Sequence, residues 1–542
     1  MTDTTVATTL VENLRDMGVQ HVFGVPSGGW VDFMEAIRTT AGIEFVLTAH
    51  EGGAGFMADV CGRLTGVPGV CFGTFGPGAT NLATGVGSAQ LDRSPLIALT
   101  DEMPDALQHR VVQMGIDHQA LMKPITKWTT RLSADNVTET LEQAYAIATE
   151  GRPGAVHIGM PVDITSSTIQ PKTLSAILSA SPPPAAAATV EAAQVAIASA
   201  RKPLLALGLG AVRANIQADL VGFAEAQGMP IVLTPMAKGL VPESHPNYAG
   251  VVFHALSDQV AETHQQADMI VAVGYDPVEF NLESWMPAVA LVNVDDAPLD
   301  IDEGACGDCL HVEGDIAGTF QAIAAMPVTP SEWDMSAVRQ RTDSMFARMS
   351  PASADFGPCA ALDVLRAELP DDGIMACDVG AHTHLIGQKW PTPRPGTQLM
   401  TNGWSAMGFG VPAAVAAKLC KPERSVCAVV GDGGFLMSAG EISTAVREKL
   451  SVVFVVLTDN DLALVRIKQE RKSYPIFGTP VREPAGTLGG PNVFGAPVLV
   501  ASDAETFATH LVNAFTAEGP VIVEALVSSA EYDELVLRKD RP

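Results

Sequence analysis

Short apolar runs alternate along most of the chain with segments whose apolar residues recur at helical spacing. Apolar runs that are bounded by turn residues and followed by a helical period are typical of buried strands in parallel sheets. The strands predicted in this way are residues 19–25, 45–47, 70–72, 96–99, 155–158, 203–207, 230–233, 269–273, 288–294, 373–377, 426–430, 452–457 and 521–526. This alternation predicts an α/β protein with parallel sheets.

Two interruptions divide the pattern into three units. Residues 181–188, with the sequence SPPPAAAA, bury little and are typical of a linker. The pattern fades again at residues 326–331, and a polar helical stretch leads from there into the last unit. A chain of 542 residues is also too long for a single hydrophobic core. We therefore expect three domains, over residues 1–170, 188–330 and 355–542.

Glycines and carboxylates follow two consecutive strands of the last unit. Residues 431–434, Gly-Asp-Gly-Gly, come directly after one strand, and Asp459 follows the next strand, 27 positions after Asp432. Parallel strands end at the same edge of a sheet, so Asp432 and Asp459 are expected to lie close together. Hard oxygen ligands beside a glycine-rich turn suit Mg²⁺ that holds a diphosphate. The alternative is a pair of ordinary turns, in which glycine and aspartate are common.

Composition narrows the classes of function. A net charge of −28 argues against nucleic acid or an anionic membrane surface as partner. No apolar run approaches the roughly 20 residues that span a bilayer, and the N-terminus lacks the pattern of a secretion signal. The eight cysteines lie mostly within apolar strand or helix patterns, which indicates reduced thiols in a cytoplasmic protein.

Two further motifs do not indicate a functional site. Cys306 and Cys309 form a CxxC without a second Cys/His pair, which favours a turn over a zinc or redox site. Residues 208–214, GLGAVRA, half-resemble a dinucleotide fingerprint after a strand. The glycine that opens the helix and the later acidic residue are both missing, which favours a tight turn there as well.

Near the N-terminus, Glu51 stands at the start of an apolar helix. At that position it either complements the helix dipole or forms a buried carboxylate that hydrogen-bonds an aminopyrimidine ring. A glycine-rich turn over residues 73–82 then enters the next helix. These segments, in this order and together with the Gly-Asp-Gly run, are hard to produce by chance.

The chain resembles the thiamine-diphosphate enzymes of the acetolactate synthase group over essentially its whole length. The resemblance is carried by residues 49–58, 76–81, 124–128, 238–246, 403–412 and 431–433. It implies three doubly wound α/β domains. Their order along the chain would be a pyrimidine-binding domain, a central domain and a diphosphate-binding domain. It also implies a homo-oligomer with active sites between two subunits, so that Glu51 reaches the cofactor of the partner chain and favours its imino tautomer.

The resemblance further implies thiamine diphosphate and Mg²⁺ as cofactors. The metal ligands would be Asp432, Asp459 and the main-chain carbonyl near Asp461. Many relatives have asparagine where this chain has Asp459, and either residue offers an oxygen ligand. The residues that resemble the cofactor-binding set are Gly380, Ala381, His382, Ser405, Met407, Gly431, Asp432, Gly433, Gly434, Asp459, Asp461 and Leu462.

Two members of this set have distinct roles in the family. Met407 matches the large apolar residue that bends the cofactor into a V shape, although methionine is also a common filler of protein cores. The carbonyl of Ser405 matches the acceptor for the 4′-amino group of the cofactor.

The activity implied is decarboxylation of a pyruvate-like 2-oxo acid, followed by ligation of the remaining fragment to an acceptor. A decarboxylase that does not ligate, or a carbon–carbon lyase acting on an anionic substrate, is the alternative on the same scaffold. A catalytically silent relative is a third possibility, against which the presence of Glu51, Met407 and Asp432 argues.

The substrate is less well specified than the cofactor. Gln113 matches only loosely the Phe-Gln pair that the family has near the substrate. Arg466 and Lys468 depart from the biosynthetic enzymes, which have tryptophan at the position of Lys468. These cations in an acidic chain predict binding of an anionic group, and the alternative is a solvated helix face. Residues 273–280 resemble the FAD-independent enzymes, so FAD is not expected.

Overall fold

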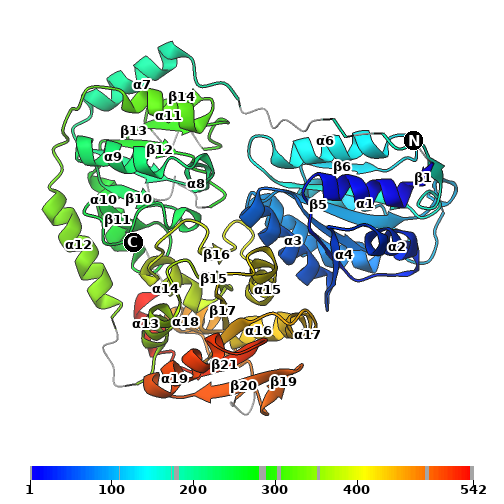
Figure 1. Cartoon of the computed structure of the whole chain (residues 1–542). Coiled ribbons are helices and arrows are strands. Elements are labelled where there is room, and N and C mark those ends of the chain that lie inside the picture. Colours follow the sequence, from blue (N-terminus) through cyan, green and yellow to red (C-terminus); the bar gives the residue numbers. More distant parts are fainter. Residues whose placement is uncertain are drawn as a thin grey trace.

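The structure is a computed structural model that describes residues 3–108, 110–172, 174–175, 182–279, 288–301, 307–350, 355–482 and 487–536. Three mostly parallel sheets, each covered by helices, form three lobes (Figure 1). This arrangement confirms the prediction of an α/β protein with three parallel-sheet domains. The exact domain boundaries remain predictions. No helix within the described ranges is both long and apolar enough to cross a membrane.

The first sheet has six parallel strands in the order β3-β2-β4-β5-β7-β6. They are β2 (His21–Gly24), β3 (Glu44–Leu47), β4 (Gly69–Gly73), β5 (Leu96–Glu102), β6 (Trp128–Arg131) and β7 (Ala155–Pro161). A short antiparallel pair, β1 (Thr4–Thr5) and β8 (Thr168–Ile169), lies beside it. Its helices are α1 (Val6–Asp16), α2 (Val31–Thr39), α3 (Glu51–Thr65), α4 (Pro77–Leu91), α5 (His118–Met122) and α6 (Val137–Thr149).

The central sheet also has six parallel strands, in the order β11-β10-β9-β12-β13-β14. They are β9 (Pro203–Leu207), β10 (Ile231–Leu233), β11 (Tyr248–Val251), β12 (Met269–Val273), β13 (Ala290–Asp295) and β14 (Cys309–Glu313). Its helices are α7 (Ala187–Ser199), α8 (Leu209–Ala214), α9 (Gln217–Gln227), α10 (Ser257–Gln266) and α11 (Ile316–Ala324), and α12 (Met335–Arg348) leads to the third domain.

The third sheet has seven strands in the order β16-β15-β17-β18-β21-β20-β19. They are β15 (Ile374–Cys377), β16 (Gln398–Met400), β17 (Val426–Gly431), β18 (Val452–Thr458), β19 (Asn492–Val493), β20 (Ala496–Ala501) and β21 (Val521–Leu526), and only β19 is antiparallel to its neighbour. Its helices are α13 (Pro358–Glu368), α14 (Ala381–Lys389), α15 (Gly410–Cys420), α16 (Asp432–Ser438), α17 (Ile442–Arg447), α18 (Ala463–Arg471), α19 (Ala504–Phe515) and α20 (Ala530–Leu535).

Each strand predicted from the apolar pattern overlaps an observed strand. The predicted turn at residues 208–214 instead leads directly into α8, whose N-cap is Gly208. Of the CxxC motif, Cys309 begins β14 and Cys306 lies outside the described residues. The helical segment after β17 begins at Asp432, directly within the Gly-Asp-Gly-Gly run, and is interrupted near Gly440 by a 3-10 turn.

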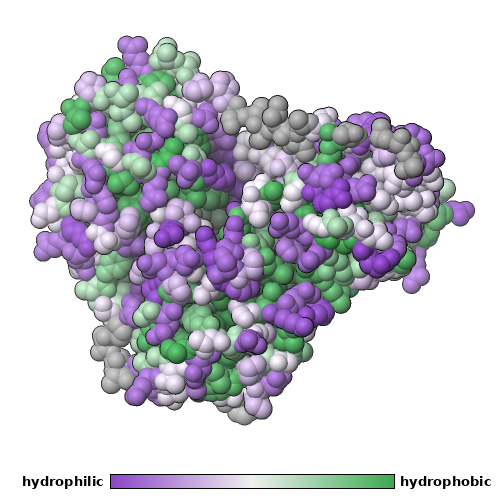
Figure 2. Space-filling model, viewed as in Figure 1, coloured by the Kyte–Doolittle hydropathy of each residue, from purple (hydrophilic) through white to green (hydrophobic). Residues whose placement is uncertain are grey.

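The first and third domains meet along α3 and α15, and hydrophobic residues gather where these two lobes join (Figures 1 and 2). The rings of Phe56 and Phe409 pack edge to face across this junction, 5.6 Å apart. Helix α3 is rich in glycine because its neighbours approach its backbone closely. A Cβ atom on Gly55 would lie 2.7 Å from the Cα atom of Gly85 on α4. The start of α3, with Glu51, is therefore fixed by packing on both sides.

A buried ion pair links the central and third domains. The Lys238 ammonium lies 3.0 Å from the Glu243 carboxylate and donates a hydrogen bond of 2.7 Å to the carbonyl of Trp390. Glu243 in turn accepts a hydrogen bond from the backbone N–H of Thr392. A buried charge is costly unless it is paired, so these contacts help to specify how the two domains dock.

Candidate cofactor site

Adjacent parallel strands β17 and β18 carry the two predicted metal-binding carboxylates to one edge of the third sheet. Gly431 is in register with Leu457, and Asp432 and Asp459 follow the ends of these strands. The backbone N–H groups of Gly433 and Asn460 each donate a hydrogen bond of 2.9 Å to the carboxylate of Asp432. The second of these bonds ties the two strand ends together.

These carboxylates lie in an environment that disfavours negative charge. Burial, followed by repulsion from Asp432 and Asp461, raises the pKa of Asp459 to about 7. Burial also raises the pKa of Asp432. One oxygen of Asp461 is buried without a hydrogen-bond partner. Clustered carboxylate oxygens with too little positive charge nearby fit a hard divalent cation such as Mg²⁺.

Gly433 and Gly434 form a floor on which a larger residue would not fit. A Cβ atom on Gly433 would lie 2.9 Å from the Leu462 side chain and 3.4 Å from the terminal methyl group of Met407. A Cβ atom on Gly434 would collide with the carboxylate of Asp378. The missing side chains let a ligand approach the backbone at the start of α16, where the N–H of Gly433 already donates to Asp432, and Leu462 and Met407 converge above Gly433.

A cavity of about 160 Å³ that opens to solvent lies over this floor. Of the predicted cofactor-binding residues, those that line it are Gly380, Ala381, His382, Met407, Gly431, Asp432, Gly433, Gly434, Asp459, Asp461 and Leu462. Ser405 lies outside this lining, in the loop that leads to Met407, with a left-handed backbone conformation (φ 53°). Of the 17 described residues that line this cavity, 11 belong to the predicted cofactor-binding set.

The loop between β15 and α14 is tied to the loop that carries Met407. Asp378 is fully buried and accepts hydrogen bonds from the backbone N–H groups of Val379 (2.7 Å) and Gly408 (2.9 Å). Burial raises its pKa to about 7 despite these bonds. His382 follows on α14, and burial lowers its pKa to about 4. Its Nε2 atom is buried without a hydrogen-bond partner, so a neutral imidazole in the cavity wall has one nitrogen left for a ligand.

Glu51 does not join this cavity within one chain. Its carboxylate is 8 % exposed and accepts a hydrogen bond of 2.9 Å from the side chain of Asn81. Among the described residues that line the cavity over Gly433, Glu51 is absent. A separate cavity, between the first and third domains, is lined by the flanking residues His50 and Gly52 together with Met407.

Glu441 is a residue that the sequence reasoning missed. One of its carboxylate oxygens accepts hydrogen bonds from the backbone N–H groups of Ala49 and His50, each 3.1 Å long, and the other accepts from the Thr444 hydroxyl at 2.7 Å. The third domain thereby holds the two residues that precede Glu51. The only signal in the sequence was a glutamate nine positions after Asp432, which does not indicate a partner nearly 400 positions away.

The two predicted substrate-binding cations of α18 differ sharply in their surroundings. Arg466 forms ion pairs of 2.8, 2.8 and 2.9 Å with Asp461, Glu470 and Asp533. Lys468 is exposed, and among the described residues no carboxylate lies within ion-pairing distance of it. Burial, and to a smaller extent the positive charge of Lys468, lowers the pKa of His384 to about 4. Gln113 is exposed in a loop of the first domain, away from the cavity over Gly433.

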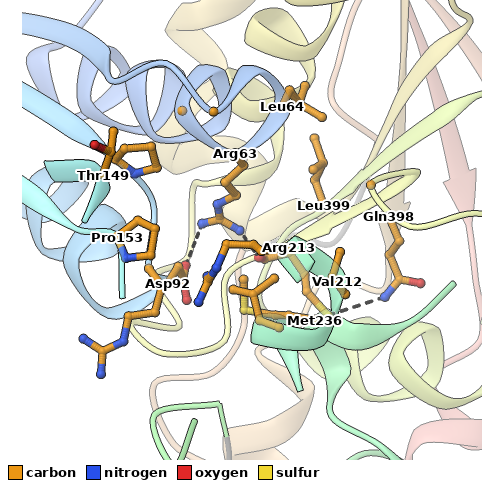
Figure 3. Close-up of a pocket in the computed structure, with 17 residues that line it drawn as sticks. Arg63, Leu64, Asp92, Thr149, Pro153, Val212, Arg213, Met236, Gln398 and Leu399 are labelled. Atoms are coloured by element: carbon orange, nitrogen blue, oxygen red, sulfur yellow. Dashed lines mark hydrogen bonds and ion pairs between the residues drawn. The ribbon is translucent and has the colours of Figure 1, made fainter. Parts of the chain in front are cut away.

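A second large cavity lies where all three domains meet (Figure 3). Arg63 on α3 reaches across it to the carbonyl of Met400 (2.6 Å) and is paired with Asp59 and Asp92 at 2.7 and 2.8 Å. Arg213 on α8 and apolar residues of the central and third domains complete the wall. The buried network around Arg63 ties the first domain to the third, as Glu441 does at the other end of α3.

Three family models match the chain, one for each sheet. The N-terminal and C-terminal TPP-binding domains of thiamine pyrophosphate enzymes match residues 4–121 and 378–525, and the central domain of these enzymes matches residues 190–323. Thiamine pyrophosphate is the same compound as thiamine diphosphate. The fold and the glycine–carboxylate cavity thus define a thiamine-pyrophosphate enzyme.

Proteins with similar sequences show to which group of thiamine-pyrophosphate enzymes the chain belongs. Acetolactate synthase of Bacillus subtilis is 30% identical, over 98% of this chain and 94% of its own length. The catabolic acetolactate synthase of Raoultella terrigena is 29% identical over 95% and 93%, and the isozyme 1 large subunit of Escherichia coli is 29% identical over 85% and 82%. The chain therefore belongs to the acetolactate-synthase-like family of thiamine-pyrophosphate enzymes, which confirms the resemblance stated from its motifs.

Substitution of Asp459 tests the metal site. Asp459→Asn keeps an oxygen ligand and removes a like charge, so we expect the Kd for thiamine diphosphate in the presence of Mg²⁺ to stay within about threefold of wild type. Asp459→Ala removes the ligand and should raise that Kd at least about tenfold. Calorimetric titration with and without a chelator measures both. Unchanged binding by the alanine variant would exclude Asp459 as a metal ligand.

Substitution of Glu441 tests whether it positions the segment before Glu51. Glu441→Ala leaves the N–H groups of Ala49 and His50 without their acceptor, and we expect kcat to fall about tenfold because misplaced catalytic groups lose rate steeply. Glu441→Gln keeps one acceptor oxygen and should recover most of this loss. The Kd for the cofactor should change less than about twofold in both variants. Equal losses for alanine and glutamine, or a loss of cofactor binding alone, would contradict a positioning role.

Proposed function

We propose that the protein catalyses thiamine-diphosphate- and Mg²⁺-dependent decarboxylation of a 2-oxo acid and ligation of the product fragment to an acceptor. The observation that carries this proposal is the cavity over Gly433, whose wall combines the paired carboxylates Asp432 and Asp459 with His382 and Met407. The acetolactate synthases among its relatives support the ligation step over simple decarboxylation.

Each part of the wall has a role in this proposal. Asp432, Asp459 and the carbonyl near Asp461 hold Mg²⁺, and the N–H groups of Gly433 and Gly434 donate hydrogen bonds to the diphosphate. Met407 supports the bend between the two rings, and the carbonyl of Ser405 accepts a hydrogen bond from the 4′-amino group. When bound, the cofactor supplies the nucleophilic carbon and the electron sink for decarboxylation.

The active site in this proposal is completed by a second copy of the chain. Glu51 does not line the cofactor cavity of its own chain. Several apolar side chains of the first and third domains are exposed and would be available to a partner surface: Val111, Met114, Ile116, Trp404, Leu436, Met437, Val465, Tyr474, Ile476 and Phe477. Glu51 would then hold the proton exchanged with the aminopyrimidine ring of the partner's cofactor.

Two further features of the proposal rest on sequence patterns. Residues 273–280 resemble the FAD-independent enzymes, so we propose that activity needs no flavin. The placement of the cysteines in apolar strands and helices supports a cytoplasmic location.

Product analysis from pyruvate tests the proposed reaction. The full-length protein with Mg²⁺ and thiamine diphosphate should release carbon dioxide and form acetolactate. Glu51→Gln should lower turnover at least about 100-fold, a typical loss for an acid–base group, while cofactor binding persists. Acetaldehyde as sole product would favour the non-ligating alternative. If pyruvate gives neither product, a screen of other 2-oxo acids for carbon dioxide release decides whether the protein is a decarboxylase at all.

Lys468 is the cation that we propose for an anionic group of the substrate, because Arg466 is already held by three carboxylates. Lys468→Met should raise KM about tenfold for a 2-oxo acid with a second carboxylate, such as 2-oxoglutarate, and leave KM for pyruvate unchanged. Lys472→Met removes an equal charge from an exposed position next to the same helix and serves as the control. Equal effects of the two variants, or no activity of wild type on any dianionic oxo acid, would contradict this role.

A further inference from the structure

Two cysteine thiols from different domains touch at the junction of α3 and α15. The Sγ atoms of Cys61 and Cys420 are 2.8 Å apart, although the residues are separated by 359 positions in the sequence. Cys61 lies on α3 of the first domain, and Cys420 is the last residue of α15 in the third domain. None of the seven cysteines that the structure describes is in a disulfide, and neither Cys61 nor Cys420 takes part in the proposed reaction.

The two cysteines differ in exposure. Cys61 is only 7 % exposed, whereas Cys420 is half-buried at the end of its helix. The hydrogen bond with Cys420, followed by burial, raises the pKa of the Cys61 thiol well above its usual value. Cys61 is therefore held as a protonated thiol against Cys420, and Cys420 is the sulfur that a dissolved oxidant reaches.

We propose that Cys61 and Cys420 are an oxidation site, at which a hydroperoxide forms an intrachain disulfide between the first and third domains. In the first step the Cys420 sulfur attacks the peroxide, the O–O bond breaks, and Cys420 becomes a sulfenic acid with release of water or an alcohol. In the second step the Cys61 sulfur displaces hydroxide from the Cys420 sulfur, and the thiol proton leaves with it as water. The two thiols thereby lose two electrons and the peroxide gains them. A dithiol reductant reverses the change by thiol–disulfide exchange.

The geometry requires little movement. The sulfur atoms must approach from 2.8 Å to the bond length of about 2.05 Å, a shift of less than 1 Å between two packed helices. The disulfide would join helices that already share one hydrophobic core, so it would fasten the junction rather than rearrange it. Cys61 lies ten positions after Glu51, about 15 Å along α3, so the contacts of Glu51 would persist.

Peptide mapping tests the proposal directly. The reduced full-length protein is treated with hydrogen peroxide, its remaining thiols are alkylated, and a non-reducing digest is analysed by mass spectrometry. We expect a linked peptide pair containing Cys61 and Cys420, loss of two of the eight thiols, and full reversal by dithiothreitol. The oxidised protein should unfold about 5 °C higher than the reduced one, with kcat within about twofold.

Variants separate this site from general oxidation. Cys420→Ser, at the half-buried helix end, and Cys61→Ala should each abolish the linked peptide and the thermal shift. Cys309→Ser, which alters another half-buried cysteine, should leave both intact. Three results would overturn the proposal: a disulfide between two chains, a link that involves another cysteine, or oxidation of Cys420 to sulfinic acid without a link to Cys61.

Discussion

The cofactor site depends on the crowding of carboxylates where β17 and β18 end. Asp432 is buried, Asp459 is half-buried and the two repel each other; among the described residues no cation lies closer to them than Arg482, which is 3.8 Å from Asp432. Backbone N–H groups relieve part of this cost, and a divalent ion, as proposed, would relieve more of it. The glycine floor, His382 and the buried Asp378 lie at this same edge of the sheet.

Parallel topology explains why so much of this cavity was predictable. Asp432 and Asp459 follow uninterrupted apolar strands, and consecutive strands that pair in parallel must end at the same edge. The positions of residues that follow such strands can therefore be predicted from the local sequence alone. The strands that the apolar pattern missed, such as β11 and β16, lie at the edges of their sheets and span only four and three residues, too few for an apolar run to stand out in the sequence.

Contacts between domains could not be predicted in the same way. Glu441 meets Ala49 across 392 positions, and the Cys61 and Cys420 sulfurs meet across 359. Neither partner has a local pattern that points to the other, because the pairing is decided by how α3 and α15 pack. The ion pairs of Arg466 could be predicted in part. Glu470 lies one helical turn away and was foreseeable, whereas Asp533 on α20 was not.

The glycine-rich helix α3 makes contacts both within the first domain and with the third domain. Its small residues let α4 and Glu441 approach its backbone on different sides, and a Cβ atom on Gly53 would collide with the Glu441 carboxylate. Glu51 is therefore positioned by backbone packing and by the third domain, not by its own side-chain partner alone. The orientation of the Glu51 carboxylate is thus set within its own chain. The same rigidity accounts for the contact of Cys61 with Cys420, three turns further along the helix.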